Sequence, residues 1–263
     1  MGRIFAITNQ KGGVGKTTTS VNLAASLVAT KRRVLLVDLD PQGNATMGSG
    51  IDKRRLQQTG CEVLLAEAEF SQTVISCEQA GYDLLPANGD MTAAEVALMQ
   101  LPQSEQRLAQ VLAAVSGRYD YILIDCPPAL NMLTVNALVA AQGVIIPMQC
   151  EYYALEGLTA LMDTIEQIRS SLNARLRIEG LLRTMFDPRN NLANEVSAQL
   201  IEHFGDRVYR TVVPRNVRLA EAPSHGLPVL LYDRKSQGAL AYLALAGEIL
   251  RRESSEQPAA VTA

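Results

Sequence analysis

Residues 9–18 read Asn-Gln-Lys-Gly-Gly-Val-Gly-Lys-Thr-Thr and follow a short apolar run at residues 4–7. Consecutive glycines let backbone N–H groups turn toward an anion, and a helix that begins here adds its positive N-terminal end. Lys16 supplies a mobile positive charge, and Thr17 supplies a hydroxyl for Mg²⁺. The stretch therefore predicts a site for the phosphates of a nucleoside triphosphate.

The loop departs from the common pattern G-x-x-x-x-G-K-[ST], because position 10 is Gln10 rather than glycine. A second lysine, Lys11, precedes Lys16 in the same loop. Two lysines exceed what one bound triphosphate needs, so Lys11 is a candidate to reach a phosphate held by a second subunit. A glycine-rich turn without a ligand is the alternative, which the order of strand, loop and helix disfavours.

The string Lys-Gly-Gly-Val-Gly-Lys-Thr-Thr resembles the deviant Walker A loop of the ParA/MinD ATPases. The resemblance implies ATP and Mg²⁺ as cofactors, and a dimer that encloses ATP between two subunits, with Lys11 acting in trans like an arginine finger. It also implies that Thr18 donates to the α-phosphate. The nucleotide-binding residues expected in this loop are Lys11, Gly12, Gly13, Val14, Gly15, Lys16, Thr17 and Thr18.

Aspartates end two of the expected strands. Asp38 and Asp40 close one strand, and Asp125 closes the apolar run Tyr-Ile-Leu-Ile. In an open parallel sheet, ligands gather outside the carboxyl ends of the strands. An aspartate after four apolar residues suits a Walker B residue, which holds Mg²⁺ directly or through water. For Asp38 or Asp40 taken alone, a helix cap or a turn explains the residue equally well.

The segment Asp-Leu-Asp-Pro-Gln-Gly-Asn-Ala-Thr resembles the first switch of the ParA/Soj branch, and Asp-Cys-Pro-Pro resembles its second switch. The resemblance implies that Asp40 orients or activates the attacking water, that Asp38 supports the Mg²⁺ shell and that Asp125 is the Walker B residue. Phosphoryl transfer depends mostly on positioning and charge stabilisation. The expected catalytic residues are therefore Lys11, Lys16 and Asp40.

The resemblance to ParA/Soj continues through Thr-Met-Phe-Asp at residues 184–187 and through residues 214–226. Loops of this kind follow the late strands and would close over the adenine. Met185, Pro214 and Asn216 are the expected base contacts.

Basic residues gather in the second half of an acidic chain. The net charge is −3, yet residues 169–235 contain eleven Lys and Arg against seven Asp and Glu. A basic face predicts weak, salt-sensitive binding of DNA phosphates without base readout, although ordinary solvated arginines are the alternative. Soj-like proteins bind nonspecific double-stranded DNA as ATP dimers. That resemblance singles out Arg189, Arg215, Arg218 and Lys235.

Strand and helix patterns alternate along the chain. A helix is expected over residues 16–29, with apolar positions on one face. Continuous apolar strands predict a mostly parallel, twisted sheet covered by helices on both faces, which is an α/β fold of the P-loop NTPase type. The expected strands cover residues 4–8, 34–38, 82–86, 121–125, 144–148, 177–182 and 208–213. We expect one ATPase domain over residues 1–252 and a flexible tail over residues 253–263.

Composition sets the class of protein. The chain has 263 residues, is 48% hydrophobic and carries four cysteines without a C-x-x-C pair, so neither a zinc site nor a disulfide framework is indicated. No secretory signal and no run long enough to span a bilayer is evident. A cytoplasmic protein, nucleoid-associated by its resemblance, is expected, without an N-terminal helix-turn-helix domain before the phosphate loop.

The favoured function is an ATP-dependent partition protein whose DNA-bound homodimer is released when a ParB/Spo0J-like partner stimulates hydrolysis. A MinD-like membrane ATPase would need a C-terminal amphipathic helix, but residues 239–250 are small and apolar nearly all round. An iron–sulfur carrier would need suitably placed cysteines to share a cluster, whereas Cys126 lies beside Asp125 and Cys150 follows an apolar strand, so both suit the core. A ParA-like ATPase that positions another cargo remains an alternative.

Overall fold

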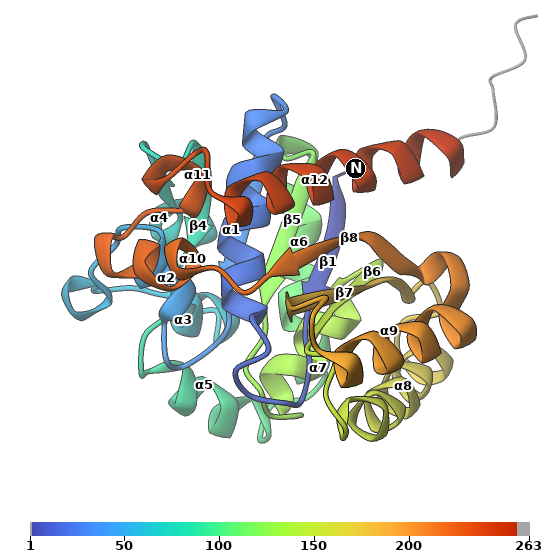
Figure 1. The fold of residues 1–263 in the computed structure, drawn as a ribbon. Helices are drawn as coiled ribbons and strands as arrows, with labels where there is room; N and C mark the ends of the chain where they lie inside the picture. Colours follow the sequence, from blue (N-terminus) through green and yellow to red (C-terminus); the bar gives the residue numbers. More distant parts are fainter. Residues whose placement is uncertain (1, 257–263) are drawn as a thin grey trace, which may run out of the picture.

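The computed structural model describes residues 2–256, in which eight strands form one sheet (Figure 1). Their order across the sheet is β3-β4-β2-β5-β1-β6-β7-β8. Neighbours pair in parallel except β3 and β4, which are antiparallel. The strands are β1 (Arg3–Ile7), β2 (Val34–Asp38), β3 (Ile75–Cys77), β4 (Tyr82–Leu85), β5 (Tyr121–Asp125), β6 (Gly143–Met148), β7 (Arg177–Phe186) and β8 (Val208–Pro214). The expected mostly parallel α/β fold is confirmed.

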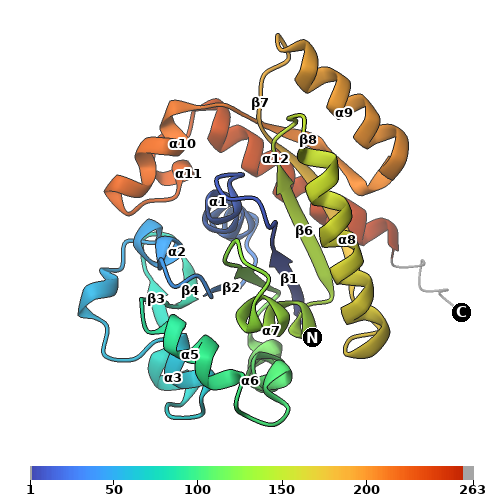
Figure 2. The same ribbon diagram turned by 90° about the horizontal axis from the view of Figure 1, so that it is seen from below.

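Helices connect the strands and cover both faces of the sheet (Figures 1 and 2). The α-helices are α1 (Lys16–Ala29), α2 (Asn44–Gly48), α3 (Gly60–Leu64), α4 (Phe70–Thr73), α5 (Met91–Leu98), α6 (Arg107–Val115), α7 (Met132–Ala140), α8 (Ala154–Ser171), α9 (Asn191–Phe204), α10 (Val217–Glu221), α11 (Val229–Tyr232) and α12 (Gln237–Glu256). Short 3₁₀ turns are η1 (Lys53–Arg55), η2 (Ser104–Gln106), η3 (Ser116–Arg118), η4 (Gly205–Arg207) and η5 (Ala222–His225).

Alternation along the strands divides the interior into two cores. In β1, Ile4 and Ala6 pack on the side of α3 and α5–α9, whereas Phe5 and Ile7 pack on the side of α1, α11 and α12. Successive side chains of a strand point to opposite faces of the sheet, so an unbroken apolar strand contributes side chains to both cores. The sheet is therefore a rigid central layer, and the carboxyl ends of β1, β2 and β5 lie side by side at one edge.

The last two strands extend beyond the ends that the sequence predicts, residues 182 and 213. β7 continues through Arg183 to Phe186, and β8 ends at Pro214. Arg183 is buried, and its guanidinium donates to Ser197 Oγ at 2.8 Å and to the carbonyl oxygen of Tyr209 at 2.8 Å. The strand continues through the charged Arg183 because Ser197 and Tyr209 accept hydrogen bonds from its buried guanidinium.

The C-terminal helix α12 packs along α1 and β8 (Figure 1). The hydroxyls of Tyr242 and Thr19 lie 3.1 Å apart in the interior, and Tyr121 donates to Glu253 at 2.5 Å. The boundary expected at residue 252 is therefore too early, because residues 253–256 continue the helix. The rest of the expected tail, 257–263, lies outside the described residues. Across residues 2–256, no helix has the length and apolarity needed to cross a membrane.

Candidate phosphate-binding site

The glycine loop joins β1 to α1 and leaves open space inside it. Gly13 and Gly15 adopt left-handed φ angles of 75° and 87°, which glycine tolerates best. A Cβ atom added at Gly12 or Gly13 would meet nothing within 4 Å. No side chain caps the N-terminus of α1, so its first backbone N–H groups point to this space. The loop can accept an anion at the positive end of a helix.

Lys16 projects back into the loop that precedes it. Its side chain is almost buried, and Nζ donates to the carbonyl oxygen of Lys11 at 3.0 Å. Burial lowers the pKa of Lys16, while the nearby charge of Asp125 opposes that shift. The ammonium group is thus held at the centre of the loop, where it can pair with a phosphate.

Two carboxylates face each other across neighbouring strands. Asp38 ends β2 and Asp125 ends β5, the two residues are partners in the strand register, and both are fully buried. Thr17 Oγ1 donates to Asp125 Oδ2 at 2.8 Å, and Ser20 Oγ donates to Asp125 Oδ1 at 2.7 Å. The structure therefore brings together Thr17, Asp38 and Asp125, the three residues that the sequence suggested for Mg²⁺. It adds Ser20, which sequence reasoning missed because a serine inside a helix carries no distinguishing pattern.

The two carboxylates are fully buried, and burial disfavours their ionised forms. Burial raises the pKa of Asp38, and burial together with the charge of Asp38 raises the pKa of Asp125. Among the residues described, no three acidic, histidine or cysteine side chains are placed to hold a metal unaided. Mg²⁺ commonly takes one or two carboxylates and completes its shell with water and substrate phosphates. The donor set of Thr17, Asp38 and Asp125 fits such a partial site.

Asp40 lies in the turn that follows β2. It is 8% exposed, its Oδ1 accepts the backbone N–H of Gln42 at 2.9 Å, and its own N–H donates to Asp38 Oδ1 at 3.1 Å. The turn fixes the Asp40 backbone against Asp38. The other carboxylate oxygen has no hydrogen-bond partner within residues 2–256, which leaves Asp40 able to accept a proton or orient a water molecule.

Lys11 points away from its own loop. Its backbone N–H donates to Asn9 Oδ1 at 3.0 Å, while Nζ lies 2.5 Å from Glu151 Oε2. Asn9 in turn donates to the carbonyl oxygen of Pro147 at 2.9 Å. The two lysines of the loop therefore have different environments, because Lys16 is buried in the loop and Lys11 forms an exposed ion pair.

The remaining loop residues are held by α1 and β7. Val14 is buried, and its carbonyl oxygen accepts a hydrogen bond from Thr184 Oγ1 at 2.8 Å. Thr18 lies in the first turn of α1, where its carbonyl oxygen accepts a hydrogen bond from Asn22. The extension of β7 beyond Leu182 thus reaches the phosphate loop.

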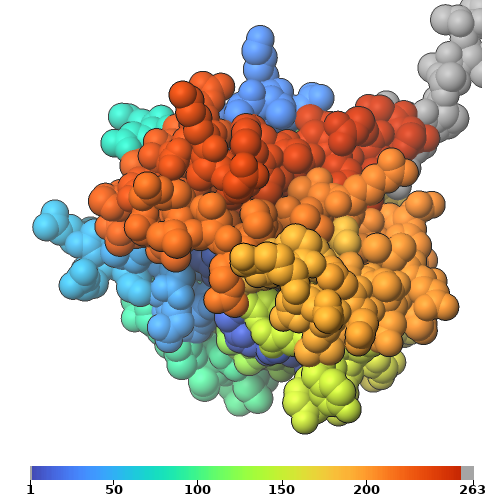
Figure 3. Space-filling model, viewed as in Figure 1, coloured from blue at the N-terminus to red at the C-terminus, as the bar shows by residue number. Residues whose placement is uncertain are grey.

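The three expected adenine contacts lie at the ends of β7 and β8, with Met185 and Pro214 in the strands and Asn216 just after β8. Met185, with a left-handed φ of 49°, accepts a contact from the Gln149 amide through its sulfur. Pro214 ends β8 opposite β7, and the Asn216 side chain caps α10 by accepting the N–H of Arg218 at 3.1 Å. Figure 3 shows N-terminal atoms, in dark blue, in a hollow bordered by the orange and yellow-green segments of the second half of the chain.

The four arginines and lysines expected to contact DNA differ in their partners. Arg189 forms two side-chain hydrogen bonds with Asp187, and Arg218 pairs with Glu221 at 2.8 Å and with Asp233 at 3.3 Å. Arg215 and Lys235 are exposed. All four side chains are accessible to solvent, although two of them carry local acidic partners.

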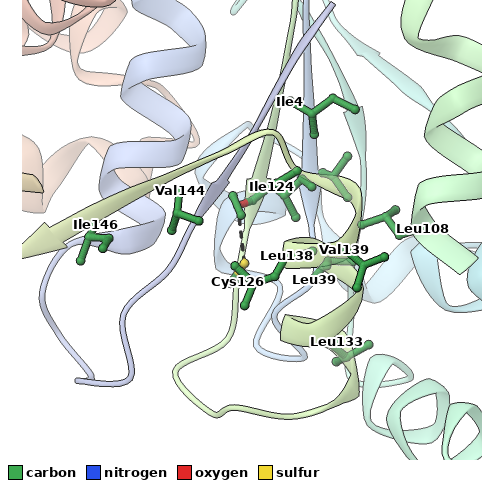
Figure 4. Packing of buried hydrophobic residues seen from close by; sticks show 14 of the residues in the cluster. Ile4, Leu39, Leu108, Ile124, Cys126, Leu133, Leu138, Val139, Val144 and Ile146 are labelled. Carbon is green, nitrogen blue, oxygen red and sulfur yellow. Dashed lines mark hydrogen bonds between the residues drawn. The ribbon is translucent and has the colours of Figure 1, made fainter. Parts of the chain in front are cut away.

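Cys126 and Cys150 are core residues, as expected from their strands. Both are buried, and burial raises the pKa of each thiol, to about 11 for Cys150. Cys126 lies among Leu39, Leu138 and other apolar side chains between β5 and α7 (Figure 4). These positions are unsuited to a cluster shared at a protein surface.

Comparison with known proteins agrees with this geometry. The family model AAA_31, described as an AAA domain, matches residues 2–178. The chromosome partitioning protein ParA of Caulobacter vibrioides is 51% identical over 257 residues, which cover 97% of this chain and 96% of the relative. The sporulation initiation inhibitor protein Soj of Bacillus subtilis is 52% identical over 249 residues, which cover 95% and 98%.

A solved structure shares the fold over nearly the whole chain. Cobyrinic acid a,c-diamide synthase from Mycobacterium smegmatis, with bound ADP and magnesium, superposes with a TM-score of 0.86 at 37% identity. The match covers 98% of this chain and 97% of that one. Fold, glycine loop and paired strand-end carboxylates together define a P-loop ATPase with a deviant Walker A loop. Within that class, the chain belongs to the ParA/Soj family of chromosome-partitioning ATPases.

Proposed function

We propose that this protein is a DNA-partition ATPase that binds nonspecific DNA as an ATP-bound dimer and leaves it after hydrolysis. The observation that carries the proposal is the convergence of Lys16, Thr17, Asp38 and Asp125 on the glycine loop of a chain about half identical to named partition proteins. The hydrolysed substrate is ATP, and the products are ADP and phosphate.

The loop N–H groups and Lys16 would hold the ATP phosphates, and Thr18 would donate to the α-phosphate. Thr17 and Asp125, already hydrogen-bonded to each other, would hold Mg²⁺ with support from Asp38. Mg²⁺ supplies charge neutralisation at the transferred phosphoryl group. Asp40 would orient the attacking water and accept its proton through the free carboxylate oxygen.

Met185, Pro214 and Asn216 would border the adenine. Support comes from their place at the ends of β7 and β8, since Thr184 of β7 already contacts the phosphate loop. The ATPase domain would run from the start of the chain through the end of α12.

A second copy of the chain would complete the site. Lys11 is exposed at the mouth of the loop, and its ion-pair partner Glu151 is followed by Tyr152 and Tyr153, which are 75% and 69% exposed. Exposed aromatic pairs of this kind favour protein–protein contact. We infer that this surface forms the dimer, with Lys11 of each subunit acting on the phosphates of the other.

Arg189, Arg215, Arg218 and Lys235 would contact DNA phosphates in the dimer. Surface ion pairs such as Arg218–Glu221 contribute little, so phosphate can replace the acidic partner at small cost. A ParB/Spo0J-like protein would stimulate hydrolysis and release the dimer from the nucleoid, and the protein would be cytoplasmic and nucleoid-associated.

The test is binding to duplex DNA of arbitrary sequence with ATP, ADP or no nucleotide, across a series of salt concentrations. ATP-only binding that weakens steeply with salt is expected, because phosphate contacts release counterions. Arg218→Glu should lose this binding, whereas Arg54→Glu, a control at the exposed turn η1, should keep it. Absence of DNA binding under every condition would overturn the proposal and favour a ParA-like ATPase that positions another cargo.

A further inference from the structure

Thr46 is a fully buried polar residue beside the candidate site. It lies on α2, and both its backbone N–H and its side-chain Oγ1 donate to Asp38 Oδ2, each at 2.8 Å. The other oxygen of Asp38 accepts the N–H of Asp40 at 3.1 Å. Both oxygens of this carboxylate are therefore held by residues of the segment 40–46.

The Thr46 hydroxyl also accepts a hydrogen bond. The backbone N–H of Ala87, just beyond β4, donates to Thr46 Oγ1 at 2.9 Å. Because this hydroxyl has one proton, the acceptance from Ala87 fixes the direction in which the proton is given to Asp38. A chain of hydrogen bonds thus runs from the end of β4 through Thr46 to the carboxylate at the end of β2.

The turn also approaches the segment after β4 closely at Gly43. Gly43 has a left-handed φ of 54°, and a Cβ atom added there would lie 2.6 Å from the carbonyl oxygen of Ala87. Only glycine lets the turn approach the β4 segment so closely. The turn that carries Asp40 therefore lies close to the segment after β4 at Gly43 and is hydrogen-bonded to that segment at Thr46.

We propose that Thr46 is a positioning residue for ATP hydrolysis, because its hydroxyl sets the orientation of the Asp38 carboxylate and, through the 40–46 turn, the place of Asp40. The proposal rests on the roles given above to Asp38 and Asp40. Thr46 is fully buried and donates to Asp38, so it acts through these aspartates. Hydrogen-bond partners of residues that hold a metal typically change affinity or activity 10- to 100-fold when they are removed.

Thr46→Val tests the hydroxyl, since valine keeps the shape and the backbone N–H but cannot donate to Asp38 or accept from Ala87. We expect kcat for ATP to fall about 10- to 100-fold while KM for ATP changes less than about threefold. The Mg²⁺ concentration that half-saturates binding of a fluorescent ATP analogue should rise, which is a readout independent of turnover. Thr46→Ser retains the hydroxyl and should stay within about threefold of the unmodified protein in both measurements.

The matched control is Thr73→Val. Thr73 is buried on α4, and its hydroxyl donates only to the local carbonyl oxygen of Glu69 at 3.1 Å. A similar loss of thermal stability in both valine variants, with loss of kcat in Thr46→Val alone, supports positioning. If Thr46→Val does not fold, Thr46→Ala gives the same comparison with a better helix former.

Three outcomes would overturn the inference. These are unchanged kcat in the folded Thr46→Val protein, an equal loss of kcat in Thr46→Ser, and a loss confined to KM and thermal stability. Asp40→Ala, measured in parallel, separates this failure from failure of the proposed function. Slow turnover in Asp40→Ala with normal turnover in Thr46→Val rejects only the role of Thr46, whereas fast turnover in Asp40→Ala rejects the site on which that role rests.

Discussion

Lys11 and Glu151 form an ion pair between the phosphate loop and the segment after β6, with Nζ 2.5 Å from Oε2. Their side chains are 40% and 51% exposed. Exposed pairs of this kind contribute about 0–1 kcal/mol, because water and salt screen the charges. The lysine proposed to act across a dimer is thus held within its own subunit by a contact that is easily broken.

Replacing Glu151 should release Lys11. Glu151→Gln is expected to lower the ATP concentration needed for dimer formation by at most about fivefold, since the pair lost is worth about 1 kcal/mol or less. Analytical ultracentrifugation across an ATP series measures this. Glu156→Gln, an exposed change in the first turn of α8, is the control and should behave like the unmodified protein. Weaker dimerisation in Glu151→Gln would show that Glu151 acts in the dimer rather than against it.

Lys16→Ala should remove nucleotide-dependent behaviour. Lys16 is the buried cation of the loop, and its loss removes the positive charge that lies near the carboxylates Asp125 and Asp40. Loss of a charged hydrogen-bond partner costs about 1.5–3 kcal/mol, or roughly 10- to 150-fold in ATP affinity. Titration with a fluorescent ATP analogue measures the affinity, and Arg54→Ala controls for loss of a surface charge. ATP-driven dimerisation at normal concentrations would reject the phosphate-loop assignment.

Asp40→Ala should separate binding from hydrolysis. Asp40 contributes one carboxylate oxygen to the turn and leaves the other unbonded, so its removal should spare the phosphate loop. Proton transfer by a positioned side chain accounts for about 10²- to 10⁴-fold in rate, and we expect a kcat loss in that range. ATP affinity and ATP-dependent dimerisation should persist. Single-turnover hydrolysis is the measurement, and rapid turnover would remove Asp40 from the mechanism.

The sequence was sufficient to predict the elements that carry the phosphate loop. Helix α1 begins at Lys16 and ends at Ala29 as expected, because glycines precede it and its apolar positions recur on one face. The sequence also indicates that Asp38 and Asp125 lie at the same edge of the sheet, since each ends an apolar strand and parallel strands end at one edge. At these positions the local sequence pattern and the general geometry of parallel sheets predict the same structure.

The missed features depend on contacts between distant segments. Strand β3 is three residues long and antiparallel, and its Ile-Ser-Cys sequence has too few residues to show a period. Ser20 and Thr46 look like ordinary helix residues in the sequence. Their hydrogen bonds to Asp125 and Asp38 depend on the tertiary fold. The helical residues 253–256 look polar in sequence, yet Glu253 is held by Tyr121 from the sheet.

Glu248 joins α12 to the edge strand β8 and should make stability depend on pH. Its carboxylate is 6% exposed, and it accepts the backbone N–H groups of Arg210 at 2.8 Å and Thr211 at 2.9 Å, with Arg252 at 2.8 Å. Burial alone would raise the pKa of Glu248, but these donors outweigh it and hold the pKa below its ordinary value. A carboxyl whose pKa is lowered by folding adds stability above the ordinary glutamate pKa of about 4.3.

That contribution is lost as the pH falls through the lowered pKa of the folded protein. Glu248→Gln should therefore lower the free energy of unfolding at neutral pH by about 1–3 kcal/mol, because the amide cannot accept all three donors. The difference from the unmodified protein should shrink below pH of about 4 as Glu248 becomes protonated in both states. Urea unfolding at several pH values measures both effects, with Glu202→Gln, an exposed change on α9, as the control. A difference that does not vary with pH would mean that Glu248 stabilises through its shape and not its charge.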